Sequence, residues 1–235
     1  VQVVAPEGVT PPSEEDLLAM FAIDEQTAMH PQAGNNIGWT FDSHGQAFDY
    51  LAQGETLTLT YTVLADDDQG GTATQNITIT ITGTNDFPVI STAGEGDAFT
   101  ATIDEEDSGL TTAGTITIED LDLSDVVAIT VDPTVQITAP EGVLAALPGN
   151  DTLLAMFAID PSTDATPGEY SDVQWSFDSQ DQAFDYLADG ETLELTYTIT
   201  ADDGQGGTAT QNITITIAGT NDTPVIAVVE GDGIN

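Results

Sequence analysis

Two stretches of this chain are close copies of one another, so any fold proposed for it has to work as a tandem array. The run Leu-Leu-Ala-Met-Phe-Ala-Ile-Asp occurs at Leu17–Asp24 and again at Leu153–Asp160. Trp39 and Trp175 have the same spacing of 136 positions (175 − 39 = 136). A unit of that length corresponds to one ordinary domain, so the chain is predicted to contain consecutive domains of one kind.

The repeats are out of phase with the numbered chain. Residues 1–86 match only the later part of a unit and lack a counterpart of Gly114–Ile118 and its neighbours. Near the other end, Glu230–Asp232 repeats Glu95–Asp97. The missing strands of the first unit are expected to come either from the parent array immediately before Val1 or from a neighbouring subunit. The expected domains are a partial repeat at 1–86, a complete repeat at 87–222 and the start of a third repeat at 223–235.

Most of each unit carries strand patterns. Leu57–Val63 and Asn76–Thr82 alternate apolar and polar residues at a period of two, and the glycines between them suit a hairpin turn. The exception is Ser13–Asp24, where a serine and three acids precede an apolar run, which predicts a short capped helix that covers the core. Further strands are predicted at Gly114–Ile118, at Val126–Val131 and around Trp39 and Trp175. The sequence therefore predicts an all-β fold with a short helical insert in each unit.

The chain has no lysine or arginine at all. It contains 41 Asp plus Glu, for a formal net charge of -41, while 40% of its residues are hydrophobic. Without basic side chains the folded chain repels itself, so its core is stable only if the acids are neutralised. Two remedies are open: general screening by salt, which shortens the Debye length to about 8 Å, or a bound divalent cation.

This composition excludes several functions. Nucleic acid and anionic membrane surfaces are excluded as partners because both are bound through Lys or Arg. The chain has no cysteine, so disulfides and thiolate metal sites are excluded. No apolar run approaches the ~20 residues of a membrane helix. The two histidines, His30 and His44, have no counterparts in the second copy, and no catalytic constellation is visible. The chain is therefore predicted not to be an enzyme.

Strand direction predicts where the acids gather. In a seven-stranded sandwich consecutive strands alternate in direction, so consecutive turns alternate between the two ends. The turn after the second strand, the last hairpin and the linker from the preceding repeat then all lie at the amino end of the complete repeat. Such a set of carboxylates suits Ca2+, which takes 6–8 oxygen ligands. The alternative is that these acids only decorate turns, where Asp and Asn are common. The candidate ligands at this junction are Asn85, Asp86, Glu119, Asp120, Asp122, Asp202 and Asp203, and Asp125 lies in the same turn.

Weaker candidates lie at the other ends of the repeats. Glu55 is expected to reach toward Asp86, and Asp66 and Asp67 occupy the matching hairpin of the first repeat. At the carboxyl end of the complete repeat, the acidic run after Ile103 is expected to meet the last strand. Its candidate ligands are Glu105, Glu106, Asp107, Glu191, Asn221 and Asp222.

The sequence resembles the VCBS repeat family and, more loosely, the bacterial cadherin-like domains of giant repeats-in-toxin adhesins. The resemblance is carried by Tyr197–Ile226, by its twin Tyr61–Ile90, and by the acidic segment Gly114–Asp125. It implies tandem immunoglobulin-like or cadherin-like β-sandwiches, export, calcium-dependent rigidity and a role in adhesion or biofilm structure. Cadherin-like linkers place similar Asp pairs and an Asn-Asp linker around calcium.

These observations favour a calcium-stabilised extender repeat of a large secreted or cell-surface adhesin, from a Gram-negative bacterium, whose partners are the neighbouring repeats of the same chain. One alternative is a repeat that assembles with identical chains into an extracellular filament or surface layer. A second alternative is a polysaccharide-binding module, in which Trp39 and Trp175 would stack on sugars, although a repeated tryptophan on a strand is more often a core residue.

Overall fold

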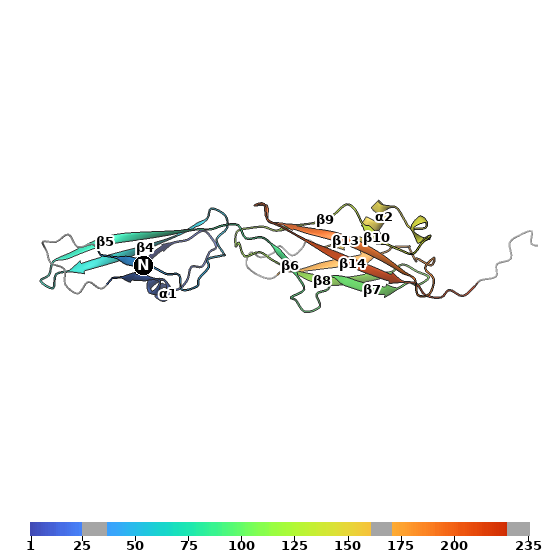
Figure 1. The fold of residues 1–235 in the computed structure, drawn as a ribbon, viewed down its shortest axis with the longest axis horizontal. Helices are drawn as coiled ribbons and strands as arrows, with labels where there is room; N and C mark the ends of the chain where they lie inside the picture. The colour runs from blue at the N-terminus through green and yellow to red at the C-terminus, as the bar shows by residue number, and fades with distance from the viewer. Residues whose placement is uncertain (25–36, 161–170, 225–235) are drawn as a thin grey trace, which may run out of the picture.

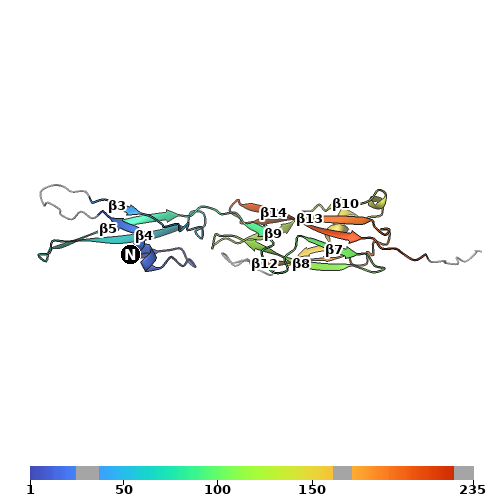
Figure 2. The ribbon, with the colours of Figure 1, turned by 60° about the horizontal axis from the view of Figure 1, so that its bottom comes forward.

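The computed structural model describes residues 1–24, 37–160 and 171–224, and two β-rich halves lie end to end in it (Figures 1 and 2). The first half contains β1 (Gln2–Val4), α1 (Glu14–Ala19), β2 (Phe21–Ile23), β3 (Trp39–Phe41), β4 (Thr56–Asp66) and β5 (Thr72–Thr82). The second half contains β6 (Val89–Ser91), β7 (Thr100–Asp104), β8 (Thr111–Glu119), β9 (Ala128–Val131), β10 (Gln136–Thr138), the 3-10 turn Val143–Ala145, α2 (Asn150–Leu154), β11 (Phe157–Ile159), β12 (Ser171–Asp178), β13 (Thr192–Asp202) and β14 (Thr208–Ala218). The prediction of an all-β fold with short helical inserts is confirmed.

The second half is a sandwich of two sheets. One sheet has the order β10-β13-β14-β7, and β9 also pairs with β13; the facing sheet has the order β11-β12-β8-β6. The apolar side chains that alternate along β8, β12, β13 and β14 point between the sheets, because successive residues of a strand face opposite ways. Ile116, Trp175, Tyr197 and Ile213 are among those that are fully buried there. These side chains form one continuous core.

The first half repeats part of this sandwich. Its sheets have the orders β1-β4-β5 and β2-β3, which correspond to β10-β13-β14 and β11-β12. A matching hydrogen bond fixes the inserted helix in both halves: the Tyr61 hydroxyl donates to the Leu17 carbonyl at 2.8 Å, and the Tyr197 hydroxyl to the Leu153 carbonyl at 2.9 Å. Within the described part of residues 1–86, no strand takes the places of β7, β8 and β9.

The helical insert is shorter than the sequence predicts. Ser13 caps the helix as expected, because its hydroxyl accepts a hydrogen bond from the Asp16 amide at 3.2 Å. The helix ends at Ala19, however, and Phe21–Ile23, predicted as helix, forms β2 against β3. Stacking of Phe21 on Tyr61, with ring centroids 4.4 Å apart, explains the change, since it holds the segment flat against the sheet. None of the described helices is long and apolar enough to cross a membrane.

Pairing with neighbouring strands also makes several strands begin or end at other residues than the sequence predicts. The predicted strands Leu57–Val63 and Asn76–Thr82 lie within β4 and β5, whose hydrogen-bonded register continues to Asp66 and Thr72. The strand predicted at Val126–Val131 begins only at Ala128, and Val126 is exposed. Residues 25–36, 161–170 and 225–235, which include His30 and most of the predicted third repeat, lie outside the described residues.

Candidate metal centre

Three segments that are distant in the sequence meet where the two halves join. The linker after β5 carries Asn85 and Asp86. The Asn85 side-chain amide donates to Oδ2 of Asp203, in the β13–β14 hairpin, at 2.8 Å. The Asp86 backbone amide donates to Oδ2 of Asp122, in the loop after β8, at 2.8 Å. The linker is therefore tied by side chains to both acidic loops of the second half.

The acids of this junction are buried. Asp122 is 0% exposed, and Asp120, Asp125 and Asp203 are also buried. Several oxygens of these acids and of Asn85 have no hydrogen-bond partner although they are shielded from solvent. These atoms are Oδ1 of Asn85, Oδ2 of Asp120, Oδ1 of Asp122 and Oδ2 of Asp125. Buried anionic oxygens without a donor are energetically costly, and with no basic side chain in the sequence they fit a bound cation as the missing partner.

Short-range contacts hold the two acidic loops in place. The Asp122 amide donates to Oδ1 of Asp120 at 3.0 Å, which curls the loop after β8. In the hairpin, the Gly207 amide donates to Oδ1 of Asp203 at 2.9 Å. A Cβ atom on Gly207 would overlap Oδ2 of Asp203 and approach Phe87 to 2.7 Å. A side chain at Gly207 would therefore displace the Asp203 carboxylate from the position in which it accepts from Asn85.

The carboxyl groups of the junction lie close enough together to shift one another's pKa values. Burial raises the pKa of Asp122 to about 6, with further increases from the charges of Asp125, Asp86 and Asp120. Burial also raises the pKa values of Asp120 and Asp125, and the charge of Asp203 adds to both. Asp203 is the exception: burial alone would raise its pKa, but hydrogen bonds from Asn85 and from backbone amides lower it. The site therefore holds several carboxylates that oppose one another's ionisation.

The hydrogen-bonded set contains five of the predicted ligands, namely Asn85, Asp86, Asp120, Asp122 and Asp203. Glu55 lies near it, since its charge contributes to the raised pKa of Asp125. Glu119, at the end of β8, is half-buried and lies opposite Val89 in the β6–β8 pairing. Asp202 is exposed, and its Oδ1 accepts from the Gly204 amide instead. Asp66 and Asp67 are exposed in the β4–β5 hairpin, at the opposite end of the first half.

Two acids near this set were missing from the predicted ligands. Asp125 is buried in the loop after β8, and its amide donates to the Asp122 carbonyl at 3.1 Å. Its place in the same acidic turn as Asp120 and Asp122 is the signal that could have identified it. Asp49 is close enough for its charge to raise the pKa of Asp86, after the larger effect of burial. Its repetition as Asp185 is the only sequence signal for it.

The carboxyl end of the second half holds a related set. Glu105 is buried, and its Oε1 accepts from the Thr220 amide at 2.9 Å and from the Thr220 hydroxyl at 2.7 Å. Its Oε2 is buried without a partner. Burial, and then the charges of Glu105, Asp107 and Asp185, raise the pKa of Asp222. In this set, Asp185 and Asp222 are the counterparts of Asp49 and Asp86. The set therefore corresponds to the side of the junction that the first half supplies.

The remaining predicted ligands at that end are less involved. Glu191 is half-buried, and its Oε2 accepts from the Ala188 amide at 3.0 Å. Asn221 is exposed, and its side-chain amide donates to the Asp222 carbonyl at 3.1 Å, as Asn85 donates to the Asp86 carbonyl. Glu106 is exposed.

Neither end is a closed metal site of acidic side chains. In the described part of the chain, no three Asp, Glu, His or Cys side chains are gathered closely enough to hold a metal ion by themselves. Binding at the junction would therefore have to draw the carboxylates inward and recruit the Asn85 amide oxygen or backbone carbonyls, which calcium accepts as ligands.

The raised pKa of Asp122 predicts an unusual pH dependence in the absence of calcium. Because the folded-state pKa of Asp122, about 6, lies above the ordinary aspartate value of 3.8, the folded chain binds the proton more tightly than the unfolded chain. Stability in EDTA should therefore rise as the pH falls from 8 to 5, on the order of 1–2 kcal/mol in the free energy of unfolding. Urea unfolding at several pH values measures this. A stability that falls steadily over that range would contradict it.

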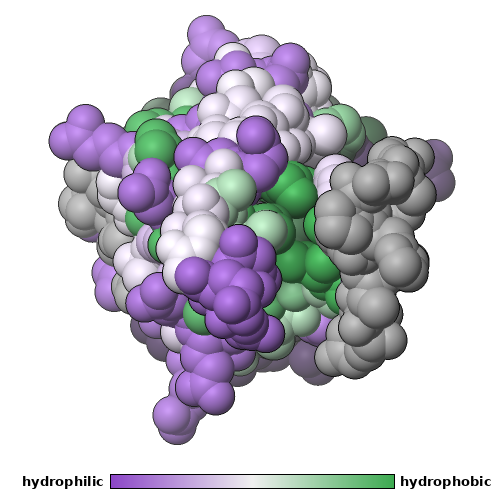
Figure 3. Space-filling view, turned by 90° about the vertical axis from the view of Figure 1, so that its left-hand side faces the viewer, coloured by the Kyte–Doolittle hydropathy of each residue, from purple (hydrophilic) through white to green (hydrophobic). Residues whose placement is uncertain are grey.

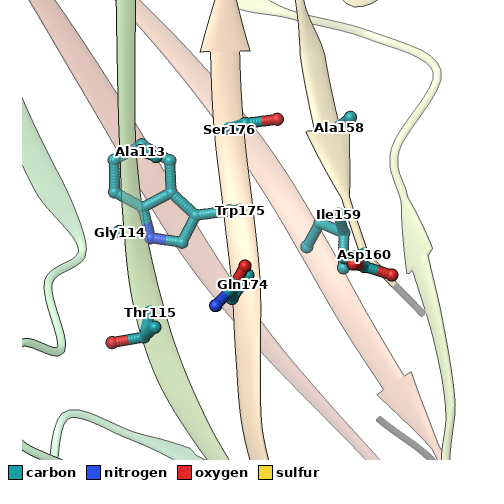
Figure 4. A pocket seen from close by; sticks show the side chains of 9 residues that line it. All are labelled: Ala113, Gly114, Thr115, Ala158, Ile159, Asp160, Gln174, Trp175 and Ser176. Atoms are coloured by element: carbon teal, nitrogen blue, oxygen red, sulfur yellow. The ribbon is translucent and has the colours of Figure 1, made fainter. Parts of the chain in front are cut away.

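The two repeated tryptophans have different surroundings. Trp175 is 1% exposed; its ring lies over β8 beside Gly114, and its indole nitrogen donates to the Ala98 carbonyl at 3.0 Å (Figure 4). Trp175 thus faces the neighbouring strand, and the pocket of about 600 Å³ that it lines offers no open indole face. Trp39 is 45% exposed. Only Trp39 is free to stack on another molecule.

Comparisons with known proteins do not assign the chain to a family. No protein-family model matches the chain, and no curated protein matches it. Among solved structures, PapD-like domain 7 of human CEP192 is similar at 10% identity and a TM-score of 0.37, over 59% of this chain and 89% of that one. The cadherin-like domains 1 to 4 of zebrafish RET are similar at 11% identity and a TM-score of 0.26, over 72% of this chain and 34% of that one. Neither similarity is high enough to assign a family.

Proposed function

We propose that the chain is a calcium-stiffened extender segment of a large bacterial surface or secreted adhesin, with residues 1–86, 87–222 and 223–235 as successive parts of a repeat array. One observation carries the proposal: buried acids from two loops of the second half meet the linker of the first half at the junction and leave anionic oxygens unpaired. An ion shared by the linker and the two acidic loops would lock one repeat onto the next. The loss of that ion would leave the carboxylates to repel one another, opposed by the two hydrogen bonds of the linker.

The ligands of this proposed site divide by role. Asp120, Asp122 and Asp125 come from one loop and would supply most of the charge. Asp203 is already fixed by hydrogen bonds to Asn85 and Gly207, so it would anchor the site rather than move on binding. Asn85 has a free buried Oδ1, which would complete a calcium ligand set of carboxylate and amide oxygens.

The proposed stiffening can be measured as the width of a distance distribution. The chain has no cysteine, so Thr78→Cys and Thr130→Cys place one spin label on each half at exposed positions. The distance distribution between the labels should be narrow in millimolar calcium and broad in EDTA. A matched pair within the second half, Thr111→Cys and Thr130→Cys, should change little. Equal widths with and without calcium for the first pair would contradict the proposal.

The same buried set speaks against a catalytic role. Its acids lie at a junction between two sandwiches, where linker and loops fill the space, rather than in an open cleft that admits a substrate. His44, one of the two histidines, is exposed, and its Nε2 lies 3.0 Å from the Ala19 carbonyl, away from these acids. In this proposal the chain acts mechanically, by setting the distance and direction between neighbouring domains.

A further inference from the structure

The first half leaves an apolar surface open that the second half covers. Trp39 is 45% exposed where its counterpart Trp175 is 1% exposed, and Ile37 is 40% exposed where Val173 is 0% exposed. Val63 and Ile77 are half-buried, whereas Ile199 and Ile213, at the same places, are fully buried. The difference lies in what covers these residues, because the residues themselves are the same or similar.

The open surface forms a groove of about 310 Å³ near the free end of the first half. It is lined by Ile23, Ile37, Trp39, Val63, Gln75 and Ile77. Figure 3 looks at that end of the molecule and shows hydrophobic surface beside hydrophilic residues. Deeper in the same half, Leu57, Leu59 and Tyr61 are buried, so the half has a core that is finished at one end only.

The second half shows what covers this surface. There β8 pairs with β12 and places Gly114 opposite Trp175, while β7 runs parallel to β14 from Thr100 opposite Thr214. A Cβ atom at Gly114 would lie 2.5 Å from the Trp175 ring, so the tryptophan fits only a strand that has glycine there. In the first half, the corresponding edges of β3 and β5 have no strand beside them among the described residues.

We propose that this groove is a docking site for a β-segment of the same type as residues 97–120, supplied by another repeat of this kind. The segment would add one strand to β3 and one strand parallel to β5, and would lay its apolar residues on Trp39, Val63 and Ile77. Backbone pairing would give the affinity, and the contact between the glycine and Trp39 would set the register. This proposal does not depend on calcium.

Binding of a synthetic peptide with the sequence of residues 97–120 to the full chain tests the proposal. In calcium buffer the peptide should bind one to one and shift Trp39 emission to shorter wavelength. The variant Trp39→Phe, which keeps Trp175, should lose that shift. The Gly114→Val peptide should bind at least about tenfold more weakly, because its side chain collides with Trp39. Equal binding of both peptides, or no binding of either, would overturn the proposal.

Variants of the chain test the position of the groove. Ile77→Asp places a charge in the groove and should weaken peptide binding about tenfold or more. Leu64→Asp is the matched control, since Leu64 is exposed outside the groove, and it should leave binding unchanged. A response of Trp39 to oligosaccharides but not to the peptide would overturn the proposal.

Cross-linking tests the register. Ser176 pairs with Ala113 in the second half, and Thr40 is the counterpart of Ser176. A chain with Thr40→Cys should therefore form a disulfide with a peptide carrying Ala113→Cys. A peptide carrying Thr117→Cys should react far less, since its cysteine lies four residues along the strand. Equal yields from the two peptides would show that no defined strand pairing forms.

Discussion

Chelation of calcium is expected to lower the melting temperature of this chain by roughly 5–10 °C. A ligand that binds only the folded state stabilises it by about 2.7 kcal/mol when present at a hundredfold excess over its Kd, and each kcal/mol corresponds to about 2–4 °C for a chain of this size. The reason to expect such a ligand is the set of buried, unpaired oxygens at the junction. Calorimetric melting in calcium and in EDTA measures the difference.

Sodium chloride at matched ionic strength is the control for this result. Salt screens exposed charges but reaches buried ones much less, so it should recover only a small part of the loss. A melting temperature that EDTA leaves unchanged would show that the acids are only a solvated surface. Full rescue by sodium chloride would lead to the same conclusion.

The second large effect is that Asp122→Asn should change the stability of the chain in opposite directions in EDTA and in calcium. In EDTA this substitution should stabilise the chain, on the order of 1–2 kcal/mol, because it removes a buried negative charge whose pKa is already raised by burial and by Asp125. In calcium the same variant should be less stable than the natural chain, because a charged ligand is lost. Denaturant unfolding in both buffers gives the two numbers.

Asp202→Asn is the matched control for Asp122→Asn. It removes the same formal charge from an exposed neighbour of Asp203, so it should change stability by less than about 0.5 kcal/mol in either buffer. Destabilisation of Asp122→Asn in EDTA would mean that the carboxylate serves the fold through its hydrogen bond from the Asp86 amide, and not through a cation.

The architecture followed from the sequence because it rests on periodic signals. The alternation in Leu57–Val63 and Asn76–Thr82 identifies strands, and the 136-residue repeat identifies tandem units. The helical insert was only partly predictable. An apolar run such as Phe21–Ile23 is compatible with either state, and stacking on Tyr61, which is distant in the sequence, decides for the strand.

The candidate site was also predictable only in part. Strand direction alone predicts which loops share an end of the sandwich, but it does not predict which acid of a pair points inward. Asp203 turns toward Asn85 and Asp202 away from it because neighbouring residues of a hairpin face opposite sides, and the exact register decides between them. The exposure of Trp39 was also not predictable from its own pattern, since the burial of its counterpart Trp175 depends on β8, a strand that is distant in the sequence.

The parallel pairing of β7 with β14 has a consequence for a chain under tension. A pull on the two ends of the second half would draw the start of β7 and the end of β14 in opposite directions along the strand axis. The evenly spaced hydrogen bonds between them would then be loaded in shear, all at once, rather than opened one by one. A module built in this way resists stretching at the contact through which force passes.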